Sequence, residues 1–338
     1  MRLPGELFLA IFPLSKKEPD GMVAEQSMDF MQEQRFAMMG VAGYVAPRHL
    51  QAIRALGHRL TVAYDPFDSV GILDRYFPET CFSTDFDRFD AAVRGGAADW
   101  LGVCTPNHLH FPHVAYGLER GMDVICEKPL GLEPAELEEM TRLEERTGRR
   151  VRTILQLRYH PEILRLKERV AQAPQDRIHD IDLTYITPRG RWYAASWKGD
   201  AARSGGVATN IGVHFYDMLH WIFGELERSV VHRASPGSVA GFLQLRRARV
   251  RYFLSIDPAC CPPQAPMTAY RKLEIDGEEF VFSDGFTDLH TECYRDILAG
   301  GGYGPADARA AIATLAGIRR ATPVGPVGDC HPWALRMA

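Results

Sequence analysis

The sequence predicts an α/β plus α+β protein: an N-terminal Rossmann dinucleotide-binding domain and a C-terminal domain with an open antiparallel sheet. Strands alternate with helices of ten or more residues as far as about residue 160, and consecutive strands with short turns follow. A chain of 338 residues also exceeds the ~150 residues of one typical domain. We predict a tail at 1–33, the Rossmann domain at 34–158, the α+β domain at 159–322 and a loose tail at 323–338.

The first half reads as repeated strand–helix units. A strand at 35–41, a helix at 46–56 and a strand at 59–65 form the opening βαβ unit. The pattern continues with a strand at 98–106, a helix at 110–121, strands at 123–129 and 151–159, and a helix at 132–148 between those two. This alternation predicts a parallel sheet with helices on both faces.

The second half changes to residues that alternate with a period of two. A helix at 161–172 precedes strands at 180–187, 238–247, 250–257 and 272–283. The last of these contains Asp276-Gly277, a dipeptide that favours a tight hairpin. We therefore predict mainly antiparallel pairing in this half.

Composition excludes several classes of function. A net charge of −4 with interspersed signs gives no basic footprint for nucleic acid. No apolar run approaches the ~20 residues of a membrane-spanning helix. The seven cysteines are scattered and form neither a disulfide framework nor a metal-ligand set, so we predict reduced thiols, a cytoplasmic location and no bound metal.

A glycine-rich turn, GVAGYVA at 40–46, joins the first predicted strand to its helix. It contributes Gly40, Gly43, Tyr44 and Val45, and it has one residue more between its first two glycines than the usual dinucleotide fingerprint. A plain tight turn is the alternative interpretation. Asp65 ends the second strand 22 residues after Gly43, where a carboxylate binds the ribose of NAD and repels the 2′-phosphate of NADP. The combination predicts NAD as the cofactor.

Two further segments follow buried strands and should lie at the same edge of the sheet. CTPNHLH at 104–110 and EKPLG at 127–131 contribute the predicted cofactor-binding residues Thr105, Pro106, Asn107, His110, Glu127 and Lys128. A partly desolvated lysine at this edge can donate to a substrate hydroxyl. The alternative for a lone lysine is a solvated surface charge.

The stretch RSGGVATNIGVHFYD at 203–217 carries the third group of polar residues. On a helix over 208–223, Asn210, His214 and Asp217 lie along one stripe, and a neighbouring apolar stripe packs inward. A single histidine on such a helix is more often structural than catalytic. Here it follows a double glycine that lets a ligand approach, and the chain also carries EKP, so we predict that His214 transfers a proton.

The βαβ unit, TPNHLH, EKPLG and the GG-x₇-H-x₂-D stretch occur in this order. Over about residues 35–320 the chain therefore resembles the Gfo/Idh/MocA oxidoreductase family. The resemblance implies a Rossmann domain, a sheet domain that binds substrate and forms a homo-oligomer (a tetramer or a dimer), and Lys128 and His214 as the catalytic pair. Many members have aspartate where this chain has Asn210, which shifts base catalysis onto His214 or Lys128.

QLRYHP, YITPRGRWY and SWKGD, with the 203–224 stretch, narrow the resemblance to the UDP-N-acetylglucosaminuronate 3-dehydrogenases of O-antigen and capsule pathways. This implies NAD-dependent oxidation of the C3 hydroxyl of a UDP-sugar, with 2-oxoglutarate as a candidate hydride acceptor. A diphosphate and a uronate need about three cations, which arginine forks supply well. The predicted substrate-binding residues are Arg158, His160, Arg189, Arg191, Trp192, Tyr193, Lys198, Asn210 and His214.

Two other functions remain open on the sequence. One is an NAD-dependent dehydrogenase of a free sugar or an inositol, which would need no contacts to a nucleotide. The other is a non-catalytic NAD-binding regulator built on the same fold. A regulator could dispense with Lys128 and His214, so their joint presence favours an enzyme.

Overall fold

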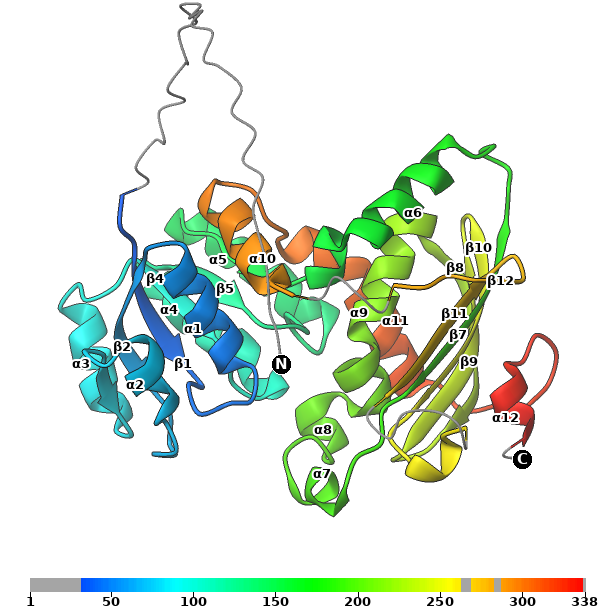
Figure 1. The fold of residues 1–338 in the computed structure, drawn as a ribbon, viewed down its shortest axis with the longest axis horizontal. Helices are drawn as coiled ribbons and strands as arrows, with labels where there is room; N and C mark the ends of the chain where they lie inside the picture. Colours follow the sequence, from blue (N-terminus) through cyan, green and yellow to red (C-terminus); the bar gives the residue numbers. More distant parts are fainter. Residues whose placement is uncertain (1–31, 263–268, 283–286, 337–338) are drawn as a thin grey trace, which may run out of the picture. The chain divides into compact units, whose positions relative to one another are not determined.

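The first sheet has six parallel strands in the order β3-β2-β1-β4-β5-β6, the order of a dinucleotide-binding fold (Figure 1). The computed structural model describes residues 32–262, 269–282 and 287–336, so nearly all of the predicted tail at 1–33 lies outside the described residues. The strands are β1 (Arg35–Met39), β2 (Arg59–Tyr64), β3 (Cys81–Ser83), β4 (Trp100–Val103), β5 (Asp123–Cys126) and β6 (Val151–Thr153). The predicted parallel Rossmann sheet is confirmed.

Helices cover both faces of this sheet because its strands are apolar on both sides. Phe36 and Met38 of β1 pack with one helix layer, and Ala37 and Met39 pack with the other. The first layer contains α1 (Ala46–Ala55), α2 (Ile72–Tyr76) and α10 (Leu289–Leu298); the second contains α3 (Phe86–Arg94), α4 (His110–Glu119) and α5 (Pro134–Thr147).

Helix α10 follows the second sheet in the sequence but packs on the first. Its buried residues Cys293, Tyr294 and Ile297 join the core that contains α1. The predicted segment 159–322 therefore does not belong as a whole to the second sheet. Periodicity identifies the apolar face of a helix but not the sheet that the face will cover.

The second sheet is mixed, in the order β12-β11-β7-β10-β9-β8. Neighbouring strands pair antiparallel, as predicted, except that β10 runs parallel to β7. The hairpin turn at Asp276 and Gly277 is confirmed, with φ values of 55° and 83°. The strands are β7 (His179–Ile186), β8 (Leu226–Ala234), β9 (Ser238–Leu245), β10 (Ala248–Ser255), β11 (Tyr270–Ile275) and β12 (Glu278–Glu279).

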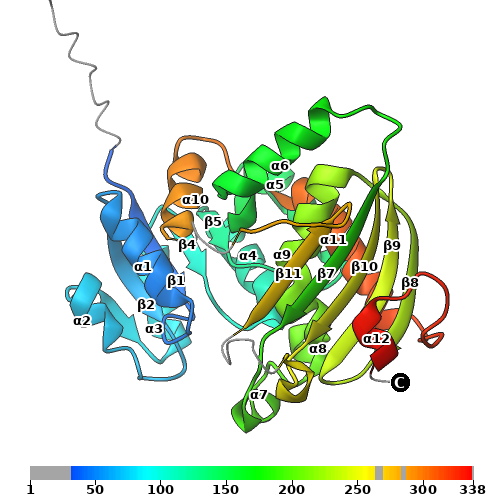
Figure 2. The ribbon, with the colours of Figure 1, turned by 45° about the vertical axis from the view of Figure 1, so that its right-hand side comes forward.

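Three long helices lie on one side of the second sheet, which Figure 2 shows most clearly. They are α6 (Pro161–Gln172), α9 (Gly206–Phe223) and α11 (Pro305–Arg320). Helix α9 approaches closely, because a Cβ at Gly212 would lie 2.6 Å from Cδ1 of Leu254. The shorter helices are α7 (Arg191–Ala195), α8 (Ala201–Ser204), α12 (Pro332–Arg336) and the 3₁₀ turns η1 (Asn107–Leu109), η2 (Gln156–Tyr159) and η3 (Pro258–Cys260).

Two predicted elements differ from the structure. The strand predicted at 151–159 ends at Thr153, and the 3₁₀ turn η2 follows it. The predicted loose tail from residue 323 packs against the second sheet instead: Asp329 pairs with Arg249 at 2.7 Å, and the ring of His331 stacks on Phe253. The tail is ordered because it covers apolar side chains on the sheet face opposite α9.

Within the described part of the chain, no helix combines the length and the apolar character needed to cross a membrane. The second sheet has charged side chains beside α12, where Arg251 forms an ion pair with Asp182.

The homo-oligomer remains a prediction. The molar mass of the protein in solution, measured by light scattering, would test it.

Candidate active site

The glycine-rich turn after β1 forms a cradle that only glycine can make. Gly40 has a φ of +86°, and a Cβ there would lie 2.6 Å from the carbonyl carbon of Cys104. Helix α1 starts behind the turn, and among the described residues no side chain caps it and no acid lies in its first turn. The positive end of the helix is thus open to an anion, which fits the pyrophosphate of a dinucleotide. Tyr44 is exposed and Val45 is half-buried beside this opening.

Asp65 lies at the end of β2, beside the glycine-rich turn. One carboxylate oxygen accepts a hydrogen bond from the Ala42 amide at 2.9 Å, and the other accepts from the Phe67 amide at 3.0 Å. The side chain therefore fixes the turn in addition to lying where the predicted ribose contact would be. The structure brings Asp65, Gly40 and Gly43 together, as the sequence predicted.

The segment after β4 joins the two halves of the protein. The Asn107 amide nitrogen donates to the Ser204 carbonyl at 2.8 Å, and Thr105 Oγ1 lies 2.9 Å from Nδ1 of His113. His110 is buried, with its ring nitrogens 2.6 Å and 2.8 Å from the carbonyls of Pro129 and Thr105. We predicted that His110 binds the cofactor, but its polar atoms bind main chain, so it holds the loops that carry Thr105, Pro106 and Lys128.

Glu127 also differs from its predicted place at the cofactor surface. The side chain is buried, and one carboxylate oxygen lies 3.0 Å from Nε2 of His49 and 3.0 Å from Nε2 of His290. The other oxygen accepts from the Lys128 amide at 3.1 Å. His49, Glu127 and His290 are also residue types that bind metal ions, and among the described residues they form the one group of three whose potential ligand atoms all lie within 4.8 Å of one another. Their closeness follows from these direct hydrogen bonds.

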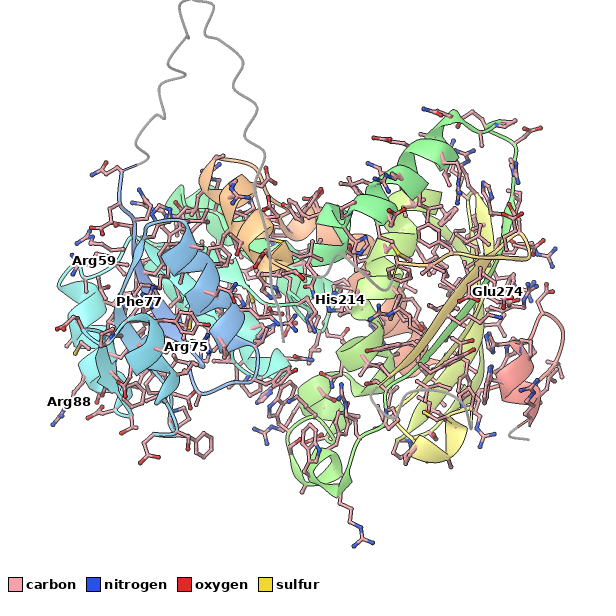
Figure 3. The ribbon with its side chains drawn as sticks, in the orientation of Figure 1. Arg59, Arg75, Phe77, Arg88, His214 and Glu274 are labelled. Carbon is pink, nitrogen blue, oxygen red and sulfur yellow. The ribbon has the colours of Figure 1, made fainter. Side chains whose placement is uncertain are left out.

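Helix α9 presents a single half-exposed stripe. Fourteen of its eighteen residues are buried, and the other four are Gly206, Asn210, His214 and Trp221. The spacing of four residues between the first three places them on one face. Figure 3 shows His214 on the side of α9 toward the first sheet, where Lys128 and Glu127 influence its charge. The predicted helix and the predicted position of Asn210 beside His214 are confirmed.

Asn210 is oriented by a neighbouring hydroxyl. Its amide nitrogen donates to the Tyr193 oxygen at 2.7 Å, which leaves the amide carbonyl as an acceptor. Tyr193 is buried, so it reaches the site through Asn210 rather than by the direct substrate contact that the sequence predicts. Asparagine cannot share a proton, so the amide can orient a hydroxyl but cannot act as the base.

Lys128 lies close enough to His214 to lower the pKa of the imidazole. Burial and the nearby Lys128 ammonium lower the pKa of His214 well below its usual value. Burial also lowers the pKa of Lys128, while Glu127 opposes this shift. The site therefore contains a neutral imidazole that can accept a proton, next to a lysine whose pKa is lower than that of a lysine in water.

Basic residues extend this site away from the first sheet. Burial lowers the pKa of Lys198, and Arg189 and then Lys128 lower it further, so these three cations lie near one another. Lys198 Nζ also lies 5.3 Å from the ring centres of Trp192 and Trp197. Within the described residues, Lys198 and Arg189 make no ion pair. Such a group of like charges favours an anionic ligand.

Arg191 and Trp192 are exposed on α7, near this group of cations. No described contact joins the Arg191 guanidinium to Lys128 or His214. The substrate contacts of Arg191 and Trp192 therefore stay predictions.

Arg158 and His160 were predicted to bind substrate, and the structure contradicts both. The Arg158 guanidinium is buried and forms a bidentate ion pair with Asp217, at 2.7 Å and 3.0 Å. The Tyr303 ring covers it at 4.4 Å. His160 is buried at the start of α6, where Nδ1 accepts from the Glu162 amide. The Asp217 carboxylate thus belongs to a structural pair and does not orient His214.

Three titratable residues near the site were not predicted. Arg48 lowers the pKa of Lys128, Arg271 lowers that of His214, and His290 contacts Glu127. Arg48 had a signal, because it lies in the first turn after the glycine-rich loop. Arg271 and His290 had none, because they come from β11 and α10, far from every motif in the sequence.

A separate hollow of about 310 Å³ lies between Arg59 and Phe77. Thr61 and Glu79 also line it, and the predicted site residues in the described part of the chain do not. The other lining residues are Leu60, Tyr76 and Pro78, so the hollow holds no convergent set of reactive groups. The chemistry lies instead at the carboxyl end of the first sheet.

Comparisons with known proteins agree with this geometry. Residues 34–154 match the family model "Oxidoreductase family, NAD-binding Rossmann fold", and residues 167–279 match "Oxidoreductase family, C-terminal alpha/beta domain". The WlbA (WbpB) dehydrogenase of Thermus thermophilus, crystallised with NAD and UDP-GlcNAcA, is 46% identical, with a TM-score of 0.85 over 89% of this chain and 99% of that one. A second structure of that dehydrogenase, with NAD and alpha-ketoglutarate, is 47% identical at the same TM-score and coverage.

Curated relatives match a smaller part of the chain. The putative oxidoreductase YteT of Bacillus subtilis is 25% identical over 158 residues, which is 46% of this chain and 37% of that protein. The chain likewise spans 38% of an uncharacterised oxidoreductase of Rhizobium meliloti, ORF334. These matches cover well under half the length of either relative.

Proposed function

Because the chain belongs to the Gfo/Idh/MocA oxidoreductase family, we propose that it oxidises the C3 hydroxyl of UDP-N-acetylglucosaminuronic acid (UDP-GlcNAcA) to the 3-keto sugar nucleotide, with NAD as cofactor. The observation that carries the proposal is the half-exposed stripe of α9, which holds Asn210 and His214, with Lys128 near His214 and a group of cations beside it. The Thermus thermophilus relative was crystallised with NAD and this sugar nucleotide. We assign the reaction to O-antigen or capsule sugar biosynthesis in the cytoplasm, which suits seven free thiols.

In the proposed reaction, bound NAD accepts the hydride that leaves C3. His214 takes the proton from the C3 hydroxyl, since its lowered pKa keeps the imidazole neutral and able to accept. Lys128 donates a hydrogen bond to the same oxygen and stabilises the negative charge that develops there. The Asn210 carbonyl, held by Tyr193, accepts from a neighbouring sugar hydroxyl and fixes the ring.

The cations explain why the proposed substrate is charged. UDP-GlcNAcA carries a diphosphate and a carboxylate, and Lys198 and Arg189 lie near Lys128 without an ion pair of their own among the described residues. An anionic ligand relieves the repulsion among these side chains when it binds. A free neutral sugar or an inositol would leave that repulsion in place.

The experiment that tests the function compares substrates. Purified protein and NAD are mixed separately with UDP-GlcNAcA, UDP-GlcNAc, free N-acetylglucosaminuronate and myo-inositol, and NADH is followed by absorbance. Of the four compounds, we expect only UDP-GlcNAcA to give NADH. When 2-oxoglutarate is added as hydride acceptor, we expect each protein molecule to oxidise more than one UDP-GlcNAcA. Equal rates with the free sugar or the inositol would support a free-sugar dehydrogenase. Binding of NAD with no sugar oxidised would support the regulator.

Arg189→Ala tests the nucleotide contact. We expect kcat/KM for UDP-GlcNAcA to fall by about 10–100-fold, since a charge-assisted contact contributes ~1.5–3 kcal/mol. Arg191→Ala, at the outer end of the basic segment, should give a smaller loss in the same direction. Arg228→Ala, an exposed arginine on β8, is the control and should keep the wild-type value. Unchanged kinetics in Arg189→Ala would contradict the nucleotide contact.

Asp65→Asn tests the cofactor preference. The substitution keeps the shape of the side chain and removes its charge, so we expect the preference for NAD over NADP to shrink by about 10-fold or more. The ratio of kcat/KM values for the two cofactors measures this. Asp68→Asn, three residues along and exposed, should leave the ratio unchanged. A wild-type enzyme that uses both cofactors equally would overturn the assigned role of Asp65.

A further inference from the structure

A buried hydrogen-bonded network adjoins Lys128 and has no part in the mechanism above. Its centre is Glu127, which follows β5 and is hydrogen-bonded to His49 of α1 and to His290 of α10. Tyr294 of α10 is hydrogen-bonded to His49 in turn. Each of the four residues is at most 6% exposed. Segments far apart in the sequence thus meet directly behind the lysine of the proposed site.

The carboxylate of Glu127 sets the direction of each hydrogen bond in this network. An ionised carboxylate only accepts, so His49 and His290 each donate an Nε2–H to the same oxygen of Glu127, both at 3.0 Å. Nδ1 of His49 then accepts from the Tyr294 hydroxyl at 2.8 Å. The second oxygen of Glu127 accepts from the main-chain amide of Lys128. Three N–H groups therefore converge on one buried carboxylate.

These donors favour the charged form of Glu127. Burial alone would raise the pKa of Glu127, but the hydrogen bonds from His290 and His49 outweigh burial and place it well below the usual value. The neighbouring thiols are those of Cys104, Cys126 and Cys293, and burial raises the pKa of each, so they stay neutral. Glu127 is thus the anion of this cluster.

The charge of Glu127 acts on Lys128. Burial lowers the pKa of Lys128, Glu127 raises it, and Arg48 lowers it. Lys198 and His214 also face the ammonium, since Lys128 lowers the pKa of each. Arg48 and Lys198 are cations and His214 is neutral. Without the charge of Glu127, the Lys128 ammonium would therefore have no negative charge among these neighbours.

We propose that His290 is a positioning residue whose hydrogen bond holds Glu127 as the fixed counter-charge that keeps Lys128 protonated during the reaction. His49 provides the same support from α1, and Tyr294 orients His49. This inference rests on the proposed function, in which the Lys128 ammonium stabilises the developing alkoxide.

The test compares His290→Leu, which removes the donor, with His290→Gln, which keeps an N–H donor near the position of Nε2. Without the donor the pKa of Glu127 rises, the carboxyl takes up a proton, and the pKa of Lys128 falls. The alkaline limb of the kcat profile should then move to lower pH by about 1 unit in His290→Leu and stay in place in His290→Gln. Tyr294→Phe, a smaller change in a buried site, should shift the limb in the same direction by less, and it serves if His290→Leu does not fold.

A second readout needs no substrate. Acetylation of Lys128 by acetic anhydride at a series of pH values, followed by peptide mass spectrometry, reports where this amine loses its proton. We expect the midpoint to fall by about 1 unit in His290→Leu and to match the wild type in His290→Gln. A shifted midpoint in a protein that oxidises no sugar nucleotide would sustain the network and refute the proposed function.

Two outcomes would overturn the network. One is an active His290→Leu enzyme whose alkaline limb and labelling midpoint both match the wild type. The other is stoichiometric divalent metal in the purified wild-type protein that His290→Leu loses, because His290 would then be a metal ligand and not a donor to Glu127.

Discussion

Replacing His214 with alanine is expected to lower turnover with UDP-GlcNAcA by about 10²–10⁴-fold, the usual contribution of a general base. Asn210 is an amide and cannot take over the proton, and in the proposed reaction Lys128 already donates a hydrogen bond to the same oxygen. NAD affinity should be unchanged, because the glycine-rich turn and Asp65 lie at other points of the sheet edge. Steady-state kinetics and NAD titration measure the two quantities on the same sample.

The pH profile adds an independent check on His214. Because burial and Lys128 hold the pKa of His214 well below its usual value, the imidazole stays neutral through pH 6.5 and becomes protonated only in more acidic solution. The wild-type rate should therefore fall on the acid side below pH 6.5, and this limb should be absent from the residual rate of His214→Ala. Near-normal turnover in His214→Ala would remove the histidine from the mechanism.

Arg158→Leu is expected to destabilise the fold by about 3–5 kcal/mol, because it leaves the Asp217 carboxylate buried without its partner. Urea denaturation of the two proteins measures the difference. Arg158→Leu combined with Asp217→Leu should recover much of the loss, since both charges are then removed. Arg165→Leu breaks an exposed pair with Glu162 and should cost less than about 1 kcal/mol.

The same variant separates the two interpretations of Arg158. The sequence predicted a substrate contact, and such a residue would raise KM when replaced and leave stability unchanged. The buried ion pair with Asp217 predicts the reverse order of effects. A stable Arg158→Leu protein with a raised KM would restore the sequence-based prediction.

Local patterns in the sequence predicted most of the fold. The apolar residues of β1 indicated a strand buried on both faces, and Asp276-Gly277 indicated the hairpin between β11 and β12. What local patterns could not supply was pairing across the chain. The parallel partner of β10 and the sheet covered by α10 depend on tertiary packing, which no short window of sequence contains.

The site divides in the same way. Asn210 and His214 share a helix, so their spacing alone placed them on one face. Arg158 and Arg189 are the same residue type and no local pattern separates them. In the structure, Arg158 is buried against Asp217, and Arg189 lies near Lys198. His290 and Glu127 are 163 residues apart and meet only because α10 returns to the first sheet. Burial and long-range contacts decide such roles, and periodicity does not report them.

In the proposed reaction, hydride leaves C3 of UDP-GlcNAcA for NAD at a site built from Lys128 and His214. Its most direct test uses UDP-GlcNAcA with deuterium at C3 and follows the label by mass spectrometry. We expect deuterium to appear in NADH, or in 2-hydroxyglutarate when 2-oxoglutarate is present, and the sugar nucleotide to become the 3-keto product. Deuterium retained in the sugar nucleotide while the enzyme reduces NAD with another substrate would contradict it.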